Sequence, residues 1–283
     1  MKKPTGLPDS LSRLNRTAVM GILNVTPDSF SDGGQYDSVP AALKHAQEMM
    51  SQGADIIDVG GESTRPGAAR VSVDEELARV IPVVQALSAE GIVVSVDTMR
   101  SEVAHEAIHA GATIINDVSG GLADENMFRV IQQNPVAYIM MHWRGHADEM
   151  GNNTHYQDVV TDVVRELRSR VNDATSAGID LNRIAIDPGI GFAKLPEQNW
   201  PLLREIQTFI EENLPVLVGV SRKRFLGEIL ATSDGPRDVR ERDFATTALT
   251  TILAQKNIWA IRVHNVQAAR DAITVVEEMR RTQ

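Results

Sequence analysis

The chain of 283 residues contains no cysteine. Without a thiol it cannot form a disulfide, a thiolate nucleophile, an iron–sulfur cluster or a zinc site with cysteine ligands. Aromatic residues make up only 4% of the chain, and no basic stripe with interleaved aromatic residues, the pattern of a general nucleic-acid binder, occurs. The formal net charge of -10 points the same way, so no nucleic-acid partner is expected.

Long apolar runs are missing as well. Nowhere do about eighteen apolar residues follow one another, so we expect no membrane-spanning helix and no membrane partner. The amino-terminal stretch MKKPTGLPDSLSRLNR carries two lysines without an apolar segment after them, which is unlike a signal peptide. We therefore expect a cytoplasmic protein with a loosely ordered tail at residues 1–16 and a single domain at residues 17–283.

What the chain does contain is a regular alternation of two apolar patterns. Short β-branched runs predict eight strands, at residues 19–25, 55–60, 92–98, 113–119, 136–142, 183–189, 215–221 and 258–264. Helical apolar spacing predicts helices at residues 40–52, 73–89, 100–110, 156–177, 245–255 and 266–279. The strands are apolar on both faces, as in a parallel sheet that is covered on one side and filled on the other.

Eight strands that alternate with helical segments in a chain of this length predict an α/β fold of one particular kind, a single (β/α)8 TIM barrel with long loops after the first two strands. The alternative is an open doubly wound sheet. That fold needs a glycine-rich nucleotide-binding turn after its first strand, and residues 24–27, Asn-Val-Thr-Pro, do not form one.

Every predicted strand ends in polar or charged side chains. They are Asn24; Glu62 to Arg65; Asp97; Asn116 and Asp117; His142; Asp187; Ser221 to Lys223; and Arg262 with His264. A helix cap explains any single Asp or Ser, but caps need no arginine, lysine or histidine. Because active sites of this fold gather at the carboxyl ends of the strands, we predict one shared polar mouth.

The mouth combines two kinds of side chain. Such barrels often bind phosphate beside strands 7 and 8. Cations and hydroxyls come from strands 2, 7 and 8, and they are Thr64, Arg65, Ser221, Arg222, Lys223, Arg262 and His264. Asp97, Asn116 and Asp187 are short, rigid groups that suit a flat heterocycle with N–H donors. Together these residues predict a phosphorylated substrate with a nitrogen-rich ring.

Seven motifs identify a family. GILNVTPDSFSDGG, DVGGESTRPGA, SVDT, NDVSG, DPGIGFAK, SRKRFLG and IRVH closely resemble the dihydropteroate synthases, in order and from about Val19 to the carboxyl terminus. MHWRG and SRKRFLG look most like the actinobacterial branch. The resemblance implies a homodimeric transferase of folate biosynthesis. With the help of Mg²⁺, such an enzyme condenses (7,8-dihydropterin-6-yl)methyl diphosphate with p-aminobenzoate to give 7,8-dihydropteroate and diphosphate.

The resemblance also implies roles for individual residues. The pterin would be held by Asp97, Asn116, Met141, Asp187 and Lys223. The diphosphate would be held by Asn24, Thr64, Arg65, Arg262 and His264, with Asn24 also binding Mg²⁺. The p-aminobenzoate pocket, which sulfonamide drugs occupy in the family, would be formed by Phe30, Thr64, Pro66, Phe192 and Ser221, with Lys223 at its border. Asp97, Lys223 and Arg65 would be catalytic.

The implied chemistry is SN1-like. Departure of the diphosphate leaves a delocalised cation on the pterin methylene, and the carboxylate of Asp97 is of the right type to stabilise that cation. The first long loop is predicted to act as a lid that brings Phe30 over p-aminobenzoate, with Gly33 and Gly34 as its hinge.

Two other functions are compatible with parts of the pattern. A pterin-dependent methyltransferase would share the Asp and Asn groups, but it has no need of the intact SFSDGG and STRPGA segments. A non-catalytic pterin-binding paralogue would be expected to lack residues such as Asp97, Arg65, Lys223 or His264, and all four are present.

Two further motifs are interpreted without any catalytic role of their own for the motif as a whole. His105, Glu106 and His109 match the HExxH pattern of zinc proteases, but they share the polar face of a predicted outer helix, and we expect them to face solvent. In the run from Arg222 to Arg224, the position just after the seventh strand favours Lys223 as the side chain that points inward.

Overall fold

The computed structural model describes residues 1–26, 38–62, 71–146 and 153–281. Its eight strands are β1 (Ala18–Asn24), β2 (Ile56–Gly60), β3 (Val94–Asp97), β4 (Ile114–Asp117), β5 (Ala137–Met141), β6 (Ile184–Asp187), β7 (Leu217–Val218) and β8 (Ala260–Val263). All neighbours pair in parallel, in the order β6-β5-β4-β3-β2-β1-β8-β7. A parallel bridge between Ile186 and Val216 joins the two ends of this sheet. The predicted TIM barrel is confirmed.

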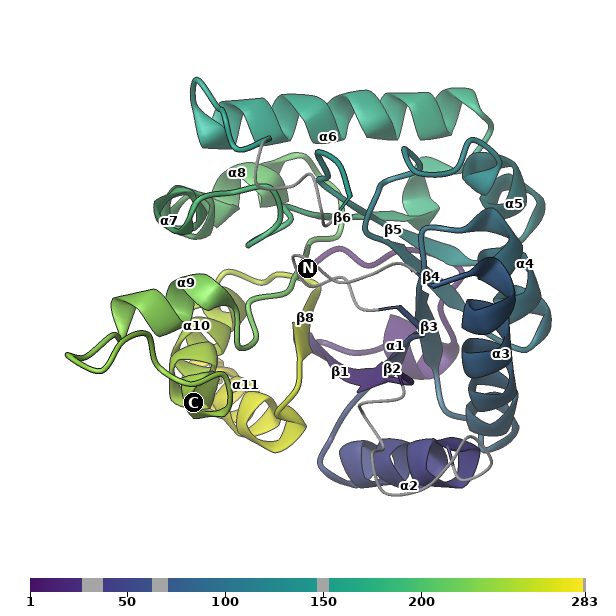
Figure 1. The fold of residues 1–283 in the computed structure, drawn as a ribbon, viewed down its shortest axis with the longest axis horizontal. Coiled ribbons are helices and arrows are strands. Elements are labelled where there is room, and N and C mark those ends of the chain that lie inside the picture. The colour runs from purple at the N-terminus through teal and green to yellow at the C-terminus, as the bar shows by residue number, and fades with distance from the viewer. Residues whose placement is uncertain (27–37, 63–70, 147–152, 282–283) are drawn as a thin grey trace.

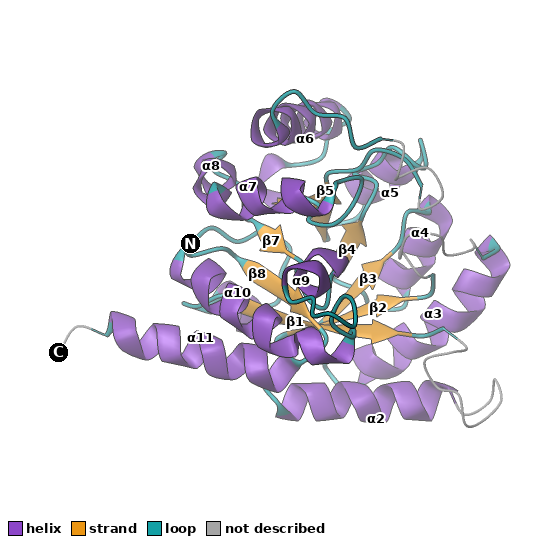
Figure 2. Cartoon of the chain, turned by 60° about the vertical axis from the view of Figure 1, so that its left-hand side comes forward, coloured by secondary structure: helices purple, strands orange, loops and turns teal. Residues whose placement is uncertain are grey.

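Helices surround the strands on the outside (Figures 1 and 2), except for the first, which lies against the amino-terminal end of the barrel. They are α1 (Asp9–Ser12), α2 (Ser38–Ser51), α3 (Val73–Ala89), α4 (Ser101–His109), α5 (Met127–Gln133), α6 (Val159–Ser176), α7 (Asn199–Arg204), α8 (Ile206–Glu211), α9 (Arg224–Ile229), α10 (Asp243–Gln255) and α11 (Val266–Arg280). The six helices predicted from apolar spacing correspond to α2, α3, α4, α6, α10 and α11. The short helices α5, α7, α8 and α9 were not predicted individually.

Local chemistry sets several of the helix starts. The side chains of Ser72, Asp158 and Asn265 each accept a hydrogen bond from a backbone N–H of the first turn of α3, α6 and α11. Each thereby satisfies a donor that has no partner within the helix. In this way the caps fix the points at which the chain leaves the strand ends.

The strand β7 is much shorter than predicted, two residues in place of seven. Pro215 has no N–H to donate, so it accepts only, from the N–H of Ile186 at 2.9 Å. The barrel is therefore closed at this point by a single bridge rather than by a continuous ladder.

Apolar side chains pack in two layers. Between the strands and the outer helices lies the larger cluster, which includes Val59, Val96 and Ile115. A smaller cluster fills the amino-terminal half of the barrel, with Met20, Ile56, Ile114, Ala185 and Ala260 among its members. Side chains alternate between the two faces of a strand, so the next inward positions are Asp58 after Ile56, Asn116 after Ile114, Asp187 after Ala185 and Arg262 after Ala260. The inner face thus changes from apolar to polar along the strands.

The amino-terminal segment has contacts of its own. Leu11 of α1 is buried and packs with the inner cluster, together with Leu7 and Leu14. The N–H of Thr5 donates to the carbonyl of Asn182 at 2.7 Å, just before β6. Residues 1–16, predicted as a loosely ordered tail, therefore lie against the amino-terminal end of the barrel and cover its apolar interior.

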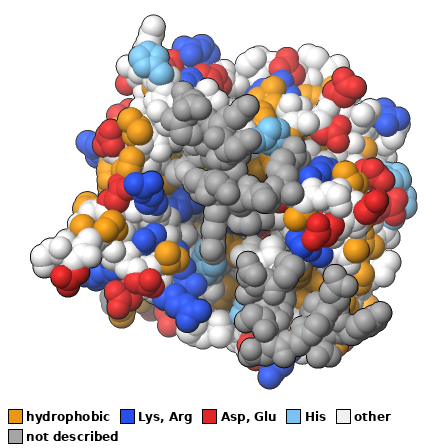
Figure 3. Space-filling view, in the orientation of Figure 1, with side chains coloured by type: hydrophobic (Ala, Val, Ile, Leu, Met, Phe, Trp, Pro, Cys, Tyr) orange, Lys and Arg blue, Asp and Glu red, His pale blue; other side chains and the backbone are white. Residues whose placement is uncertain are grey.

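Basic and acidic side chains are interspersed over the described part of the face seen in Figure 3. Among the described residues, no helix combines the length and the apolar character needed to cross a membrane. The HExxH residues His105, Glu106 and His109 are exposed on α4, as predicted. Within the described ranges, no three His, Cys, Asp or Glu side chains are grouped as a metal site would require.

Candidate active site

Four polar side chains from four strands meet directly above the apolar interior. Arg262 on β8 donates from Nε to Asp58 Oδ2 at 2.6 Å and from Nη2 to Asp97 Oδ2 at 2.9 Å. The amide of Asn116 on β4 donates to the same oxygen of Asp58 at 3.2 Å. Asp58, Asp97 and Asn116 are buried. This cluster joins β2, β3, β4 and β8 into one mouth and brings together three of the predicted site residues.

Asp58 was missed by the sequence analysis, which considered only the strand ends. It lies one inward position below the end of β2, between Ile56 and Gly60 on the same face. A carboxylate inside an otherwise apolar run is the signal that could have found it, because a buried charge needs a partner. Here the partner is Arg262.

The charges of this cluster shift one another's pKa values. Burial raises the pKa of Asp97 to about 7; the charge of Arg262 opposes this shift and that of Asp58 reinforces it. Burial would lower the pKa of Arg262, but Asp58 and Asp97 outweigh that effect and raise it. Arg262 therefore stays charged, and Asp97 can exchange its proton near neutral pH.

A second group lies around Lys223, which follows β7. Its ammonium donates to the carbonyl of Ile190 and lies 4.3 Å from the ring centroid of Phe192. Burial lowers the pKa of Lys223 to about 8, although the charge of Asp187 opposes that shift. Burial raises the pKa of Asp187, and Lys223 opposes it. The two residues thus influence each other from the ends of β6 and β7, which the bridge between Ile186 and Val216 makes neighbours.

Gly219 lies between Arg262 of the first group and Lys223 of the second. A Cβ atom at this position would lie 3.8 Å from Cβ of Arg262 and 4.0 Å from Nζ of Lys223. Gly60 lies in a similar way between Asn24 and Asp97. A Cβ atom there would lie 3.7 Å from Asn24 Oδ1 and 3.7 Å from Asp97 Cβ. At both glycines a Cβ atom would therefore be in van der Waals contact with polar side chains of neighbouring strands.

Ser221 and His264 form a third group, after β7 and β8. The N–H of His264 donates to Ser221 Oγ at 3.1 Å, and this Oγ lies 2.9 Å from Nδ1 of the His264 ring. A hydroxyl that accepts from the backbone can donate its proton to Nδ1. Neutral His264 would then carry its proton on Nε2.

Several strand-end residues have structural roles outside the mouth. Asp117, next to Asn116, accepts from the hydroxyls of Ser119 and Tyr138 at 2.6 and 2.7 Å. Arg222 makes a bidentate ion pair with Asp243 at 2.7 and 2.8 Å. Both are therefore engaged with the outer layer.

Lys223 is the inward cation of its run, as predicted, because Arg222 and Arg224 are bound elsewhere. Arg224 is exposed and pairs with Glu228 one turn further along α9. Met141 at the end of β5 is buried and in register with Asp187, so it lies in the wall beside the second group.

Four predicted site residues, Phe30, Thr64, Arg65 and Pro66, lie outside the described residues, as does the predicted lid with its glycine hinge. The described residues on either side of the second loop are Glu62 and Val71, and one side chain contacts both. Arg100 pairs with Glu62 at 3.0 Å and donates to the carbonyl of Val71 at 2.5 Å. Arg100 also pairs with the buried Glu76.

Comparison with known proteins identifies the family of this chain. The family described as "Pterin binding enzyme" matches residues 20–264. The dihydropteroate synthase of Mycobacterium leprae is 47% identical over 262 residues, which cover 91% of this chain and 92% of the relative. The chain belongs to the dihydropteroate synthase family. It is therefore a transferase of folate synthesis, as the motifs predicted.

Solved structures of the family have the same fold. The dihydropteroate synthase of Xanthomonas albilineans, solved with 4-aminobenzoic acid, matches with a TM-score of 0.87 and 42% identity over 95% of both chains. The Yersinia pestis enzyme, solved in a sulfonamide drug complex, matches with a TM-score of 0.86 and 41% identity over 98% of both chains. The match to the Mycobacterium leprae enzyme agrees with the resemblance of MHWRG and SRKRFLG to the actinobacterial branch.

Proposed function

We propose that the mouth binds (7,8-dihydropterin-6-yl)methyl diphosphate and p-aminobenzoate side by side and joins them into 7,8-dihydropteroate with release of diphosphate. The observation that carries this assignment is the ion-paired cluster of Asp58, Asp97, Asn116 and Arg262 at the mouth of a barrel of this family. It combines hydrogen-bond acceptors for a heterocycle with a fixed cation for a leaving anion.

The pterin would bind to the short polar groups. Asp97, Asn116 and Asp187 supply carboxylate and amide atoms at buried inward positions, and each matches an N–H or a ring acceptor of a flat, nitrogen-rich ring. A buried polar group without a partner costs about 1–3 kcal/mol, so such a site discriminates against rings that lack these atoms. Met141 would pack against the ring, and Lys223 would donate to it.

The diphosphate would bind at the β1, β7 and β8 side, to Arg262, His264 and the residues of the second loop, Thr64 and Arg65. Asn24 would hold Mg²⁺ through its amide oxygen. Such a site fits the metal, because Mg²⁺ prefers oxygen ligands, keeps several waters and commonly uses substrate phosphates with only one or two protein groups. Bound there, the metal would neutralise charge on the diphosphate.

Bond breaking then depends on two fixed charges. Arg262 would stabilise the departing diphosphate, and the ionised Asp97 would stabilise the cation that develops on the pterin methylene. Because that cation exists only on the way to product, its attraction to Asp97 lowers the barrier rather than merely binding substrate. Kinetic isotope effects at the methylene carbon that indicate an associative displacement would contradict this SN1-like route.

The aniline nitrogen of p-aminobenzoate would attack from the side of Phe192 and Ser221, with Phe30, Thr64 and Pro66 completing the pocket and Lys223 at its border. The attack forms the C–N bond, and the nitrogen afterwards releases a proton. Asp97, Lys223 and Arg65 are the proposed catalytic residues.

We further propose a homodimer that works in the cytoplasm. Large apolar side chains are exposed on the adjacent helices α10 and α11, namely Phe244, Ile252, Val275 and Met279. Phe244 is 87% exposed, and an interface would remove such surface from water. Sedimentation equilibrium that gives a monomer at micromolar concentration would contradict the dimer.

The proposed function is tested by diphosphate release with both substrates, with each alone, and with both in EDTA. We expect release only when both substrates are present, in equal amount to the dihydropteroate formed, and its loss in EDTA with recovery on excess Mg²⁺. Release that does not depend on p-aminobenzoate, or methyl transfer from a methylated folate, would contradict the assignment. Full activity in EDTA would contradict the proposed requirement for Mg²⁺ and the proposed role of Asn24 in binding it.

A further inference from the structure

Lys194 is a buried cation for which the reaction described above has no use. Its Nζ lies 3.0 Å from Nδ1 of His142, 2.9 Å from the carbonyl oxygen of Gly189 and 3.0 Å from that of Phe192. An ammonium group has three N–H donors and no acceptor. The three partners use all of these donors, so Lys194 fits its surroundings as an ammonium group.

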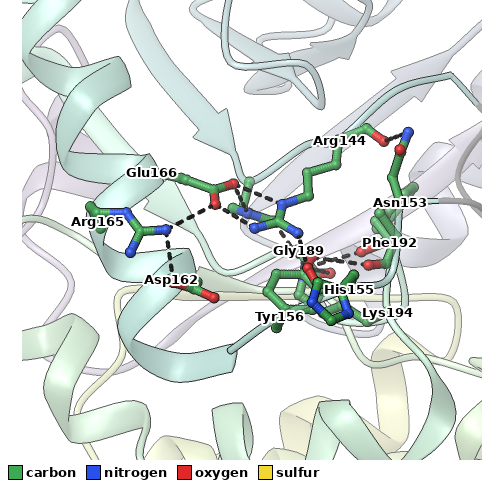
Figure 4. A network of polar contacts seen from close by, with 12 residues as sticks. Arg144, Asn153, His155, Tyr156, Asp162, Arg165, Glu166, Gly189, Phe192 and Lys194 are labelled. Carbon is green, nitrogen blue, oxygen red and sulfur yellow. Dashed lines mark hydrogen bonds and ion pairs between the residues drawn. The ribbon is translucent and has the colours of Figure 1, made fainter. Parts of the chain in front are cut away.

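A chain of polar groups continues behind Lys194. Because Nδ1 of His142 accepts from Lys194, its proton lies on Nε2, which donates to Glu166 Oε2 on α6 at 3.0 Å. Arg144 donates from Nε to the same carboxylate at 2.9 Å, and Arg165 lies on its other side (Figure 4). Burial and the charge of Lys194 lower the pKa of His142 to about 4. His142 is therefore a neutral link between a carboxylate and an ammonium group.

The segment that Lys194 holds is not relaxed backbone. Gly189 and Gly191 have φ angles of 69° and 79°, and Ala193, which has a Cβ, has a φ angle of 47°. The left-handed conformation is unfavourable for alanine, because its Cβ lies too close to the following carbonyl oxygen, and it persists only where the surroundings impose it. Tyr156 supports it from outside, since its hydroxyl donates to the carbonyl of Ala193 at 2.9 Å.

The other side of the same segment faces the mouth. The carbonyl of Ile190 accepts from Lys223, and the ring of Phe192 lies beside that ammonium group. A Cβ on Gly191 would come within 2.9 Å of the Lys223 side chain, so the segment and Lys223 are packed closely. A displacement of residues 189–194 would therefore move Phe192 and change the environment of Lys223.

We propose that Lys194 is a positioning residue, which holds residues 189–194 so that Phe192 and the Ile190 carbonyl stay against Lys223 at the p-aminobenzoate side of the mouth. The proposal rests on the proposed function, in which Phe192 borders that pocket. Lys194 itself touches neither substrate.

The proton on Lys194 makes this role dependent on pH. Burial, followed by the charge of Lys223, lowers the pKa of Lys194 to about 7; Asp187 and Glu166 oppose the shift and Arg144 adds to it. The neutral amine has two donors for three acceptors, so one of the three contacts is lost. The segment is held less firmly as the pH rises through and above 7, and the KM for p-aminobenzoate should rise with it.

Lys194→Met tests the proposal, because methionine keeps an unbranched buried side chain and removes all three donors. We expect a rise of about tenfold in the KM for p-aminobenzoate, which corresponds to about 1.4 kcal/mol, with a much smaller change in kcat. The part of the alkaline rise of this KM that is centred near pH 7 in the wild-type enzyme should be absent in the variant. Hydrogen–deuterium exchange should become faster in the amides of residues 189–194.

Two further variants make the outcome decisive. Tyr156→Phe removes a single hydrogen bond to the same segment, and should raise the same KM about threefold while keeping its alkaline rise. Lys256→Met, an exposed lysine after α10, should behave as wild type. A folded Lys194→Met variant with wild-type KM and exchange would overturn the proposal. If that variant does not fold, wild-type KM and exchange in Tyr156→Phe would overturn it.

The exchange measurement separates this proposal from the proposed function. If the wild-type enzyme released no diphosphate in response to p-aminobenzoate, the proposed function would fail. Unchanged exchange at residues 189–194 in the folded Lys194→Met variant overturns the positioning role whatever the activity.

Discussion

At the scale of the residue, the chemistry depends on how a strand alternates its side chains. Ile56 and Ala260 lie on the apolar floor of the barrel, and two residues further along, Asp58 and Arg262 form an ion pair 2.6 Å long. Such a buried pair needs good geometry to offset the loss of hydration of both charges. Here the geometry fixes a guanidinium group at the mouth and leaves it charged.

The raised pKa of Asp97 predicts that activity falls on the acidic side of the pH profile. Because burial raises its pKa to about 7, free enzyme below pH 7 has Asp97 mostly protonated and unable to stabilise a cation. The kcat/KM for the pterin diphosphate should therefore rise with pH up to an apparent pKa near 7. A flat profile down to pH 5 would contradict this role of Asp97.

Asp58→Asn should move that limb to lower pH, because the charge of Asp58 raises the pKa of Asp97. It should also lower kcat/KM by about tenfold, since Arg262 loses one of its two carboxylate partners. The matched control is Asp55→Asn at the opposite end of β2, where Asp55 pairs with Arg16 at 2.6 and 2.7 Å. The control should lose stability but keep the wild-type pH profile; an equal effect of both variants on kcat/KM would contradict the assignment.

At the scale of the element, strands were easier to predict than short helices. The eight β-branched runs and the six long amphipathic segments have enough residues to show a period, and each was found. Helices α5, α7, α8 and α9 have six or seven residues each, which is under two full turns. Their apolar residues show no clear helical period, so contacts with the barrel decide their conformation.

Residues 1–16 are predicted from the sequence to form a loosely ordered tail. In the structure, however, Leu7, Leu11 and Leu14 pack against the apolar cluster at the amino-terminal end of the barrel. Leu11→Ala should lower the free energy of unfolding by about 2–4 kcal/mol, measured by urea denaturation, with unchanged KM values. Leu181→Ala, at a leucine that is 47% exposed, should change it by less than about 0.5 kcal/mol. Equal effects of the two variants would contradict the packing of α1.

At the scale of the whole molecule, the fold and the position of the mouth followed from the sequence, but the pairing within the mouth did not. Counting strand ends found Asp97, Asn116, Asp187, Lys223 and Arg262, because parallel strands end at one edge. It could not tell that Arg222 pairs with Asp243, or that Asp58, one layer lower, pairs with Arg262. These facts depend on contacts between β2 and β8 and between the loop after β7 and α10, which lie far apart in the sequence.

Two cations outside the mouth contact the loops that border it. Arg100 contacts the residues on both sides of the second loop, and Lys194 holds the loop after β6 from behind. Both are cations in the shell outside the mouth, paired with residues of neighbouring strand–helix units. The mouth is thus shaped by the packing between units as much as by the strands themselves.

The proposed role of Asp97 is to stabilise charge that develops during the reaction. The measurement that tests it most directly compares the turnover of Asp97→Asn with its affinity for the pterin, measured by isothermal titration calorimetry. We expect kcat to fall by about 10²–10³, while the dissociation constant of the pterin changes only a few-fold, because asparagine keeps one acceptor and the shape of the side chain. Equal losses of turnover and pterin affinity would contradict the claim and leave Asp97 as a binding residue alone.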